Sequence, residues 1–386
     1  MLELVATTSL QQEANRKPDA SWDSFLAKRY FDVIDNPILY ARPNKETFKI
    51  NDITVSLSLY SPNGTYKAID LKERMEEMMI AQKAFLGDVD STKEYNILLY
   101  LSQLNENDAQ GFGALEHHTS TVGVLPESMS KDRLEQAMID VVSHEFFHIV
   151  TPLSIHSKEI QYFDFNDPKM SQHLWMYEGT TEYFANLFQI QQNLIDEEEF
   201  YERIMQKVAN AKGYDDAMSF TIMSKNILKE PYETNYANVY EKGALINMAL
   251  DILIREKSNG QKGILWLMKQ LSRKYGKDVP FEDDKLIDEI VDLTYPEVKI
   301  FFDNHVFIVI FNTINALIKP KRHPRGVAFN FDICRARIFH YALATPKLLG
   351  RRVRARPSDI VSSAKPSTRR VSRGSITPWS RQRPEV

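Results

Sequence analysis

The sequence is most constrained by two histidines spaced four residues apart, with a glutamate directly after the first. These residues are His144, Glu145 and His148, within a stretch, 131–150, whose apolar positions follow a helical period that Pro152 would end. Residues four apart lie on one face of a helix, so both imidazoles can bind one zinc ion. Glu145 could then accept a proton from the attacking water. The pattern can arise by chance among nine histidines, but its position inside a helix favours a functional site.

A third metal ligand is available on the next predicted helix, at residues 174–190. Glu178 is the candidate ligand, because a zinc site of this kind needs a third protein donor and an open fourth position. Glu182 lies four residues further on the same face, where it could orient a ligand imidazole or simply be a solvated carboxylate. His156 and His173 are the nearest competing donors in the sequence. Neither has a spacing that faces the first pair, so both are predicted to be surface residues or supporting residues near the site.

The order of predicted elements places strands first and helices afterwards. Residues 1–66 look rich in strands, residues 53–59 alternate between apolar and polar, and 95–101 form a compact apolar run. Helices are predicted at 69–86, 131–150, 174–190 and 239–254, with a helical pattern continuing from about 260 to 304. This order predicts an α+β fold in which the active-site helix packs on a mixed sheet, with a helical lobe behind it.

Charge is distributed unevenly along the 386 residues. Residues 319–386 carry 17 basic and 3 acidic side chains, whereas the rest of the chain carries 31 basic and 49 acidic ones. We predict that 305–386 is a basic, poorly ordered tail. Such a tail could bind nucleic acid non-specifically, but no aromatic interleaving or nucleic-acid-binding fold accompanies it, which argues against this function.

The remaining composition limits the type of metal site and the location of the protein. Cys334 is the single cysteine, so a metal ion would be held by histidines and carboxylates. The start of the chain lacks the basic and apolar regions of a signal peptide, which predicts a cytoplasmic protein by default. The apolar run at 306–318 is too short for a membrane helix and is predicted to be a buried strand or short helix.

Three separate segments resemble the glycyl aminopeptidase family of zinc metallopeptidases, which are relatives of aminopeptidase N with a thermolysin-like catalytic domain. Residues 113–117 are similar to the family's Gly-Gly-Leu-Glu-His strand, with Ala114 in place of the second glycine. Residues 144–148 and 175–179 together resemble its metal-binding motifs, and 239–245 resemble its Tyr-x-Lys-Gly motif. The resemblance implies a gluzincin, with one zinc ion per chain held by two histidines and a glutamate.

The resemblance also implies roles for residues outside the metal group. Glu116 would bind the free α-amine of a peptide substrate, although an ordinary strand carboxylate is the alternative. Tyr240 would donate a hydrogen bond to the oxyanion, with Tyr236 as the nearest rival. Gly113 and Ala114 are small enough for a substrate backbone to pair with an edge strand there. His117 is predicted to be structural or to line the pocket, and His118 is predicted to be exposed.

These expectations define a leading function and its rivals. The leading hypothesis is a zinc aminopeptidase that removes small N-terminal residues such as glycine or alanine. A thermolysin-like endopeptidase would use the same metal group, and a truncated, inactive protein that binds metal and peptides is the alternative outside the enzymes. The resemblance further implies a partial N-terminal β domain at 1–66 and a catalytic domain at 67–304.

Overall fold

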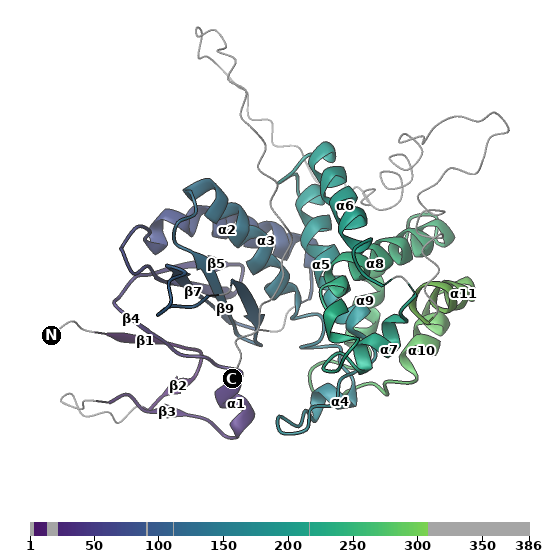
Figure 1. The fold of residues 1–386 in the computed structure, drawn as a ribbon, viewed down its shortest axis with the longest axis horizontal. Helices are drawn as coiled ribbons and strands as arrows, with labels where there is room; N and C mark the ends of the chain where they lie inside the picture. Colours follow the sequence, from purple (N-terminus) through teal and green to yellow (C-terminus); the bar gives the residue numbers. More distant parts are fainter. Residues whose placement is uncertain (1–3, 14–21, 90–91, 111, 216, 308–386) are drawn as a thin grey trace, which may run out of the picture.

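The structure is a computed structural model that describes residues 4–13, 22–89, 92–110, 112–215 and 217–307. A sheet with its covering helices forms one half of the molecule, and a group of helices forms the other (Figure 1). The fold is therefore α+β with a mixed sheet, as predicted. Apart from its first three residues, the predicted tail lies outside the described residues, and so does most of the apolar run at 306–318.

The larger sheet has five strands in the order β5-β6-β7-β9-β8. Strands β6, β7 and β9 are parallel, while β5 and β8 pair antiparallel with their neighbours. The described strands are β1 (Val5–Thr7), β2 (Gln11–Gln12), β3 (Phe25–Leu26), β4 (Leu39–Ala41), β5 (Lys45–Ile50), β6 (Ile53–Tyr60), β7 (Glu94–Ser102), β8 (Gly113–Glu116) and β9 (Ser120–Pro126). Among these strands β8 is an edge, so one side of its backbone has no strand partner.

Helices follow β3, β6 and β9, and they are the main regular elements of the described chain after β9. The described helices are α1 (Tyr30–Ile34), α2 (Ala68–Leu86), α3 (Lys131–Phe147), α4 (Lys158–Gln161), α5 (Leu174–Gln191), α6 (Glu197–Ala211), α7 (Phe220–Lys225), α8 (Asn238–Lys257), α9 (Ile264–Lys274), α10 (Leu286–Leu293) and α11 (Glu297–Phe302), with a 3-10 turn η1 (Glu233–Asn235) and a π turn η2 (Asp303–Phe307). No helix in this described part of the chain is both long and apolar enough to cross a bilayer.

Helix α3 ends earlier than the sequence pattern predicts. Its last residue is Phe147, and the chain then tightens because the backbone N–H groups of His148 and Val150 donate to the carbonyls three residues before them. The prediction that the helix runs to residue 150 is therefore wrong by three residues. His148 nevertheless remains in the last helical turn, so its ring still lies beside that of His144, with the ring centroids 4.9 Å apart.

The alternation of apolar and polar residues in β6 suggested that one face of the strand is exposed to solvent. The structure shows that both faces are buried. Val55 and Leu57 are buried in the core shared with α2, but Ser56 and Ser58 on the other face are also buried. The N-terminal segment covers that second face, where the hydroxyls of Ser58 and Thr7 lie 3.4 Å apart. A short polar side chain is thus compatible with burial wherever a second segment supplies a hydrogen-bond partner.

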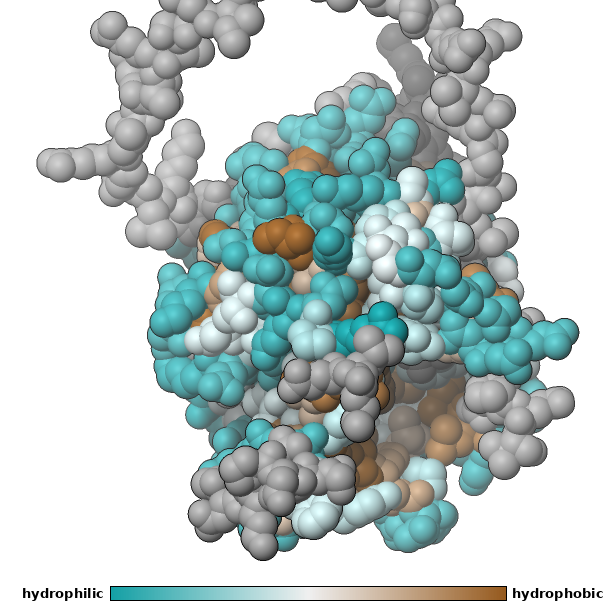
Figure 2. All heavy atoms as spheres, turned by 90° about the vertical axis from the view of Figure 1, so that its left-hand side faces the viewer, coloured by the Kyte–Doolittle hydropathy of each residue, from teal (hydrophilic) through white to brown (hydrophobic). Residues whose placement is uncertain are grey.

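The N-terminal elements lie on one side of the larger sheet (Figure 1). From this side the surface is mostly polar, with apolar residues visible in a recess in the lower part (Figure 2). Several large apolar side chains of these elements are exposed, among them Leu26, Tyr30, Val33 and Tyr40. Apolar side chains on this side of the molecule are therefore less completely buried than those inside the two halves of the fold.

Two glycines let helices α5 and α8 pack with their backbones in close contact. A Cβ atom added to Gly179 would lie 2.7 Å from the carbonyl carbon and oxygen of Gly243. The side-chain amide of Asn247 bridges the same crossing, donating to the carbonyls of Trp175, at 2.6 Å, and Gly243, at 2.8 Å. This close crossing fixes the position of the acidic residues of α5 relative to the first turn of α8.

Candidate active site

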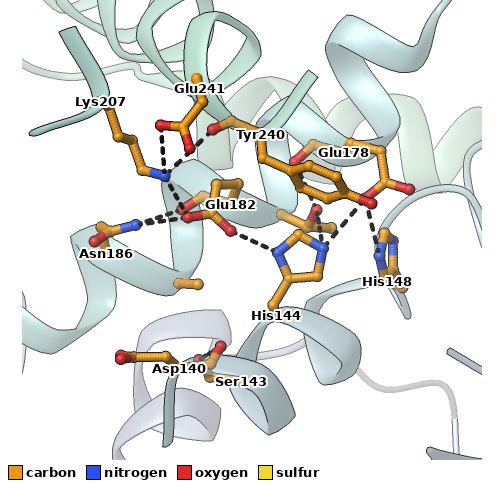
Figure 3. A network of polar contacts seen from close by, with 12 residues as sticks. Asp140, Ser143, His144, His148, Glu178, Glu182, Asn186, Lys207, Tyr240 and Glu241 are labelled. Carbon is orange, nitrogen blue, oxygen red and sulfur yellow. Dashed lines mark hydrogen bonds and ion pairs between the residues drawn. The ribbon is translucent and has the colours of Figure 1, made fainter. Parts of the chain in front are cut away.

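His144, His148 and Glu178 converge on one point, although they come from two different helices (Figure 3). One ligand atom from each of the three lies within 4.8 Å of the others. Glu178 Oε2 is 3.2 Å from His144 Nε2 and 3.6 Å from His148 Nε2. Two imidazoles and one carboxylate form the donor set of a three-ligand zinc site with an open fourth position.

The hydrogen bonds of the two histidines leave the correct ring nitrogen free for a metal ion. His148 Nδ1 lies 2.9 Å from the carbonyl oxygen of Thr151, which can only accept, so this nitrogen carries the proton. His144 Nδ1 donates in the same way to Glu182 Oε2, at 2.9 Å. In both rings Nε2 faces Glu178 and is the nitrogen left to bind a divalent metal ion, so the residues present fit such an ion.

The electrostatics around His144 also favour a positive charge at this point. Burial alone would lower the pKa of His144, but hydrogen bonds to Glu178 and Glu182 raise it well above its usual range. In the described part of the chain, those two carboxylates are the acidic groups that contact this ring directly. The same negative charges would stabilise a bound cation.

Glu145 is buried beside this group with one carboxylate oxygen unpartnered. Its Oε2 has no hydrogen-bond partner among the described residues, and the residue is 8% exposed. Burial raises the pKa of this carboxyl to about 7. An unpartnered buried carboxylate is costly, which indicates that a substrate or solvent molecule normally completes its hydrogen bonding.

Glu116, at the end of edge strand β8, faces the same group. Its carboxylate, that of Glu145 and one imidazole nitrogen of His148 all lie within 4.8 Å of one another. The strand pairs with β9 on one side only, with Gly113 opposite Val124 and Ala114 opposite Gly123. The unpaired side of a strand with small residues is open to an extended peptide.

Tyr240 lies in the first turn of α8, next to the metal-binding residues. Its ring centroid is 5.6 Å from that of His144, and its hydroxyl is 3.1 Å from the hydroxyl of Tyr236. The two tyrosines that the sequence leaves as rivals are thus in contact with each other. Since Tyr240 contacts a ligand ring, it is the better placed of the two to act on a substrate carbonyl.

The remaining histidines differ in part from the sequence predictions. His156 and His173 are buried, so the prediction of surface positions is wrong, and their rings bind Gln161 and the carbonyl of Asp283 instead of the metal group. His118 was predicted to be exposed but is only partly so, because Nδ1 donates to Asp35 at 3.0 Å. His117 is buried beside the same carboxylate.

Sequence reasoning missed Lys207, on α6. Its ammonium group donates to Glu182 Oε1 at 2.6 Å and to the carbonyl of Tyr240 at 3.3 Å. A signal for this residue exists in the sequence. Phe200, Ile204 and Ala211 form the buried stripe of α6, and Lys207 occupies the same stripe, where a cation needs a buried partner.

Comparison with known proteins supports a peptidase. Residues 137–246, which contain both metal-binding segments and Tyr240, match the family model of the M61 glycyl aminopeptidases. Over these residues the chain is similar to the M61 peptidase family. The match supports the resemblance inferred from short motifs, and with it a peptidase domain.

The fold of this chain is also found in a solved structure. It is similar to the crystal structure of an aminopeptidase N family protein from Idiomarina loihiensis, with a TM-score of 0.68 at 22% sequence identity. The match covers 79% of this chain and 53% of the other, so the chain spans about half the length of that protein. No curated protein matches the sequence.

The convergence of His144, His148 and Glu178 predicts that added zinc stabilises the fold. At a free zinc concentration of about 100 times Kd, binding should add about 2.7 kcal/mol to the free energy of unfolding and raise Tm by roughly 5–10 °C. Glu178→Gln should abolish most of this increase, because one of the three ligands is weakened. Thermal unfolding with and without zinc measures this increase in Tm. The control is Glu202→Gln, at an exposed position on α6. An equal increase in Glu178→Gln and the unsubstituted protein would contradict the ligand assignment.

Proposed function

We propose that the protein is a zinc-dependent aminopeptidase of the gluzincin type that removes small N-terminal residues, glycine or alanine, from peptides. His144, His148 and Glu178 hold one zinc ion per chain, Glu145 handles the proton of the attacking water, and Glu116 binds the substrate's α-amine. Gly113 and Ala114 pair with the substrate backbone. The similarity of residues 137–246 to the glycyl aminopeptidases supports the small-residue preference.

The observation that carries this proposal is the position of Glu116. Its carboxylate is within 4.8 Å of the carboxylate of Glu145 and of His148, at the end of an edge strand. A peptide that extends strand β8 would bring its backbone to this point. A carboxylate there can bind an ammonium group through charge-assisted hydrogen bonds, which fixes the distance from the N-terminus to the bond that is cleaved.

The chemistry divides between the metal ion and the protein's own residues. A zinc ion at His144, His148 and Glu178 would supply Lewis acidity towards the scissile carbonyl. Glu145 accepts a proton as the water oxygen forms its bond to the carbonyl carbon, and delivers that proton to the leaving nitrogen as the C–N bond breaks. Its raised pKa, about 7, suits both transfers near neutral pH.

Tyr240 contributes by stabilising the developing negative charge. Its hydroxyl donates a hydrogen bond to the carbonyl oxygen as that oxygen becomes an oxyanion, an effect worth about 3 kcal/mol in comparable enzymes. The contact between the hydroxyls of Tyr236 and Tyr240, at 3.1 Å, supports this role because it restricts the rotation of the Tyr240 side chain. The direction of that hydroxyl is then set before substrate binds.

The proposal includes the organisation of the chain. Strands β5 and β6 together with residues 67–304 form a thermolysin-like catalytic domain, and strands β1 to β4 belong to an N-terminal β region. The arrangement of α3 and α5, which carry the ligands beside a mixed sheet that includes β5 and β6, supports the first assignment. The strands β1 to β4 pair with one another and not with the described strands of the larger sheet, which supports the second. The boundary that we propose therefore lies before β5, not at residue 66.

The test compares an alanyl or glycyl peptide with the same peptide N-acetylated, using zinc-loaded protein. Cleavage should require the free amine. Glu116→Gln should lower kcat/KM for the free-amine peptide by roughly 10–100-fold, the expected loss of a hydrogen bond to a charged group. The exposed Glu106→Gln, on the loop before β8, is the matched control.

The other outcomes discriminate between the rival functions. Cleavage of the acetylated peptide at a rate equal to that of the free peptide, with no effect of Glu116→Gln, would indicate an endopeptidase. Tight binding of one zinc ion without cleavage of either peptide would indicate a protein that binds metal and peptides but has no catalytic activity.

A further inference from the structure

Lys207 connects three parts of the candidate site that come from different helices. Its ammonium group lies 2.6 Å from Glu182 Oε1 on α5, 3.3 Å from the carbonyl oxygen of Tyr240 and 3.8 Å from Glu241 Oε2, both on α8 (Figure 3). The side chain of Lys207 is 12% exposed and that of Glu182 is 21% exposed. The site thus contains a nearly buried ion pair whose cation comes from α6, a helix that carries no metal ligand.

Glu182 uses both of its carboxylate oxygens. Oε2 accepts from His144 Nδ1 at 2.9 Å, while Oε1 accepts from Lys207 and, at 3.4 Å, from the side-chain amide of Asn186. The orientation of the carboxylate plane is therefore determined from both ends. Without the contact at Oε1, Glu182 could rotate, and the His144 ring would lose the acceptor that fixes its orientation.

We propose that Lys207 is a positioning residue, which holds Glu182 against His144 and uses the first turn of α8 as its second anchor. The inference rests on the proposed zinc site. Through this single cation, the orientation of a metal-ligating imidazole is linked to the backbone of Tyr240. A change at Lys207 should therefore affect zinc affinity even though Lys207 is not a ligand.

The main measurement is zinc affinity, determined by competition with a chromophoric chelator. Lys207→Met keeps the length of the aliphatic stem but removes the charge, and we expect Kd for zinc to rise about tenfold, as for other residues that support metal ligands. In steady-state kinetics with an alanyl peptide, kcat should fall about tenfold while KM changes less than about twofold, since Lys207 does not face the substrate strand.

Arg203→Met is the matched control. Arg203 lies one turn before Lys207 on the same helix and pairs with Asp140 on α3 and Glu199 on α6, at 3.0 and 2.7 Å. This variant removes a cation that docks α6 without contact to Glu182. It should leave the zinc Kd unchanged. An increase as large as that in Lys207→Met would overturn the proposal, because the effect would then arise from loosening of α6.

A comparison of Glu182→Gln with a double variant keeps the proposal testable if Lys207→Met does not fold. Glu182→Gln combined with Lys207→Met removes both charges together, which avoids an unpaired buried carboxylate at position 182. Because Lys207 acts through Glu182, zinc affinity should be equal in Glu182→Gln and in the double variant. A further tenfold loss in the double variant would overturn the proposal.

These affinities do not depend on turnover. If the protein binds zinc but cleaves no peptide, the proposed aminopeptidase function is wrong. The zinc affinities of the variants still test the role of Lys207. Unchanged zinc affinity in Lys207→Met would overturn the positioning role whatever the activity.

Discussion

Replacing Glu145 with glutamine should lower kcat for an alanyl peptide by roughly 10²–10⁴-fold, with little change in the zinc content of the protein. Glutamine has nearly the same shape but cannot accept and return a proton. Glu145 is not among the three residues that converge as ligands, and its Oε2 has no partner in the described residues, so the substitution removes chemistry and few structural contacts. Steady-state kinetics and metal analysis of the same sample measure the two quantities.

The control for this variant lies on the same helix. Glu135 is also on α3 but faces Lys131, with 3.6 Å between the charged atoms, away from the ligands. Glu135→Gln should keep full activity. If Glu145→Gln keeps an activity within tenfold of that of the unsubstituted protein, Glu145 is not the base. If Glu145→Gln loses zinc, Glu145 has a role in metal binding that we do not assign to it.

The metal group was predictable because its residues are close in sequence or lie on well-marked helices. The four-residue spacing of His144 and His148 determines their common face as soon as a helix is assigned. Glu178 followed from the need for a third ligand on a neighbouring helix. In contrast, the contact between Glu178 and both imidazoles depends on how α5 packs on α3, which no local pattern encodes.

The residues that sequence reasoning missed act across long sequence separations. Lys207 meets Glu182 and Tyr240 because α6 packs against α5 and α8, and Asp35 meets His117 and His118 because the N-terminal segment packs on the β8–β9 hairpin. Helical periodicity shows that a charged residue lies on a buried face, but it does not identify the partner. The same limit explains why the sequence left His156 and His173 as either surface residues or supporting residues near the site.

The glycine that follows Glu178 should be as sensitive to substitution as the ligands themselves. In Gly179→Ala the added Cβ would lie 2.7 Å from the backbone of Gly243 and from the amide of Asn247. Backbone atoms in a helix cannot move aside cheaply, so α5 and α8 must separate. We expect the free energy of unfolding to fall by about 1–3 kcal/mol, the usual cost of overpacking, as measured by urea denaturation.

Gly179→Ala should also lower the rate of the folded protein. Glu178 and Glu182 lie on one side of the crossing and Tyr240 on the other, so separating the helices moves the proposed oxyanion donor away from the metal group. A displacement of about 1 Å can lower the rate roughly 10²-fold. Gly123→Ala is the control, since its Cβ would meet Leu99 at an ordinary contact distance of 3.5 Å. Normal kcat in folded Gly179→Ala would contradict the claim that this crossing determines the position of Tyr240 relative to the metal-binding residues.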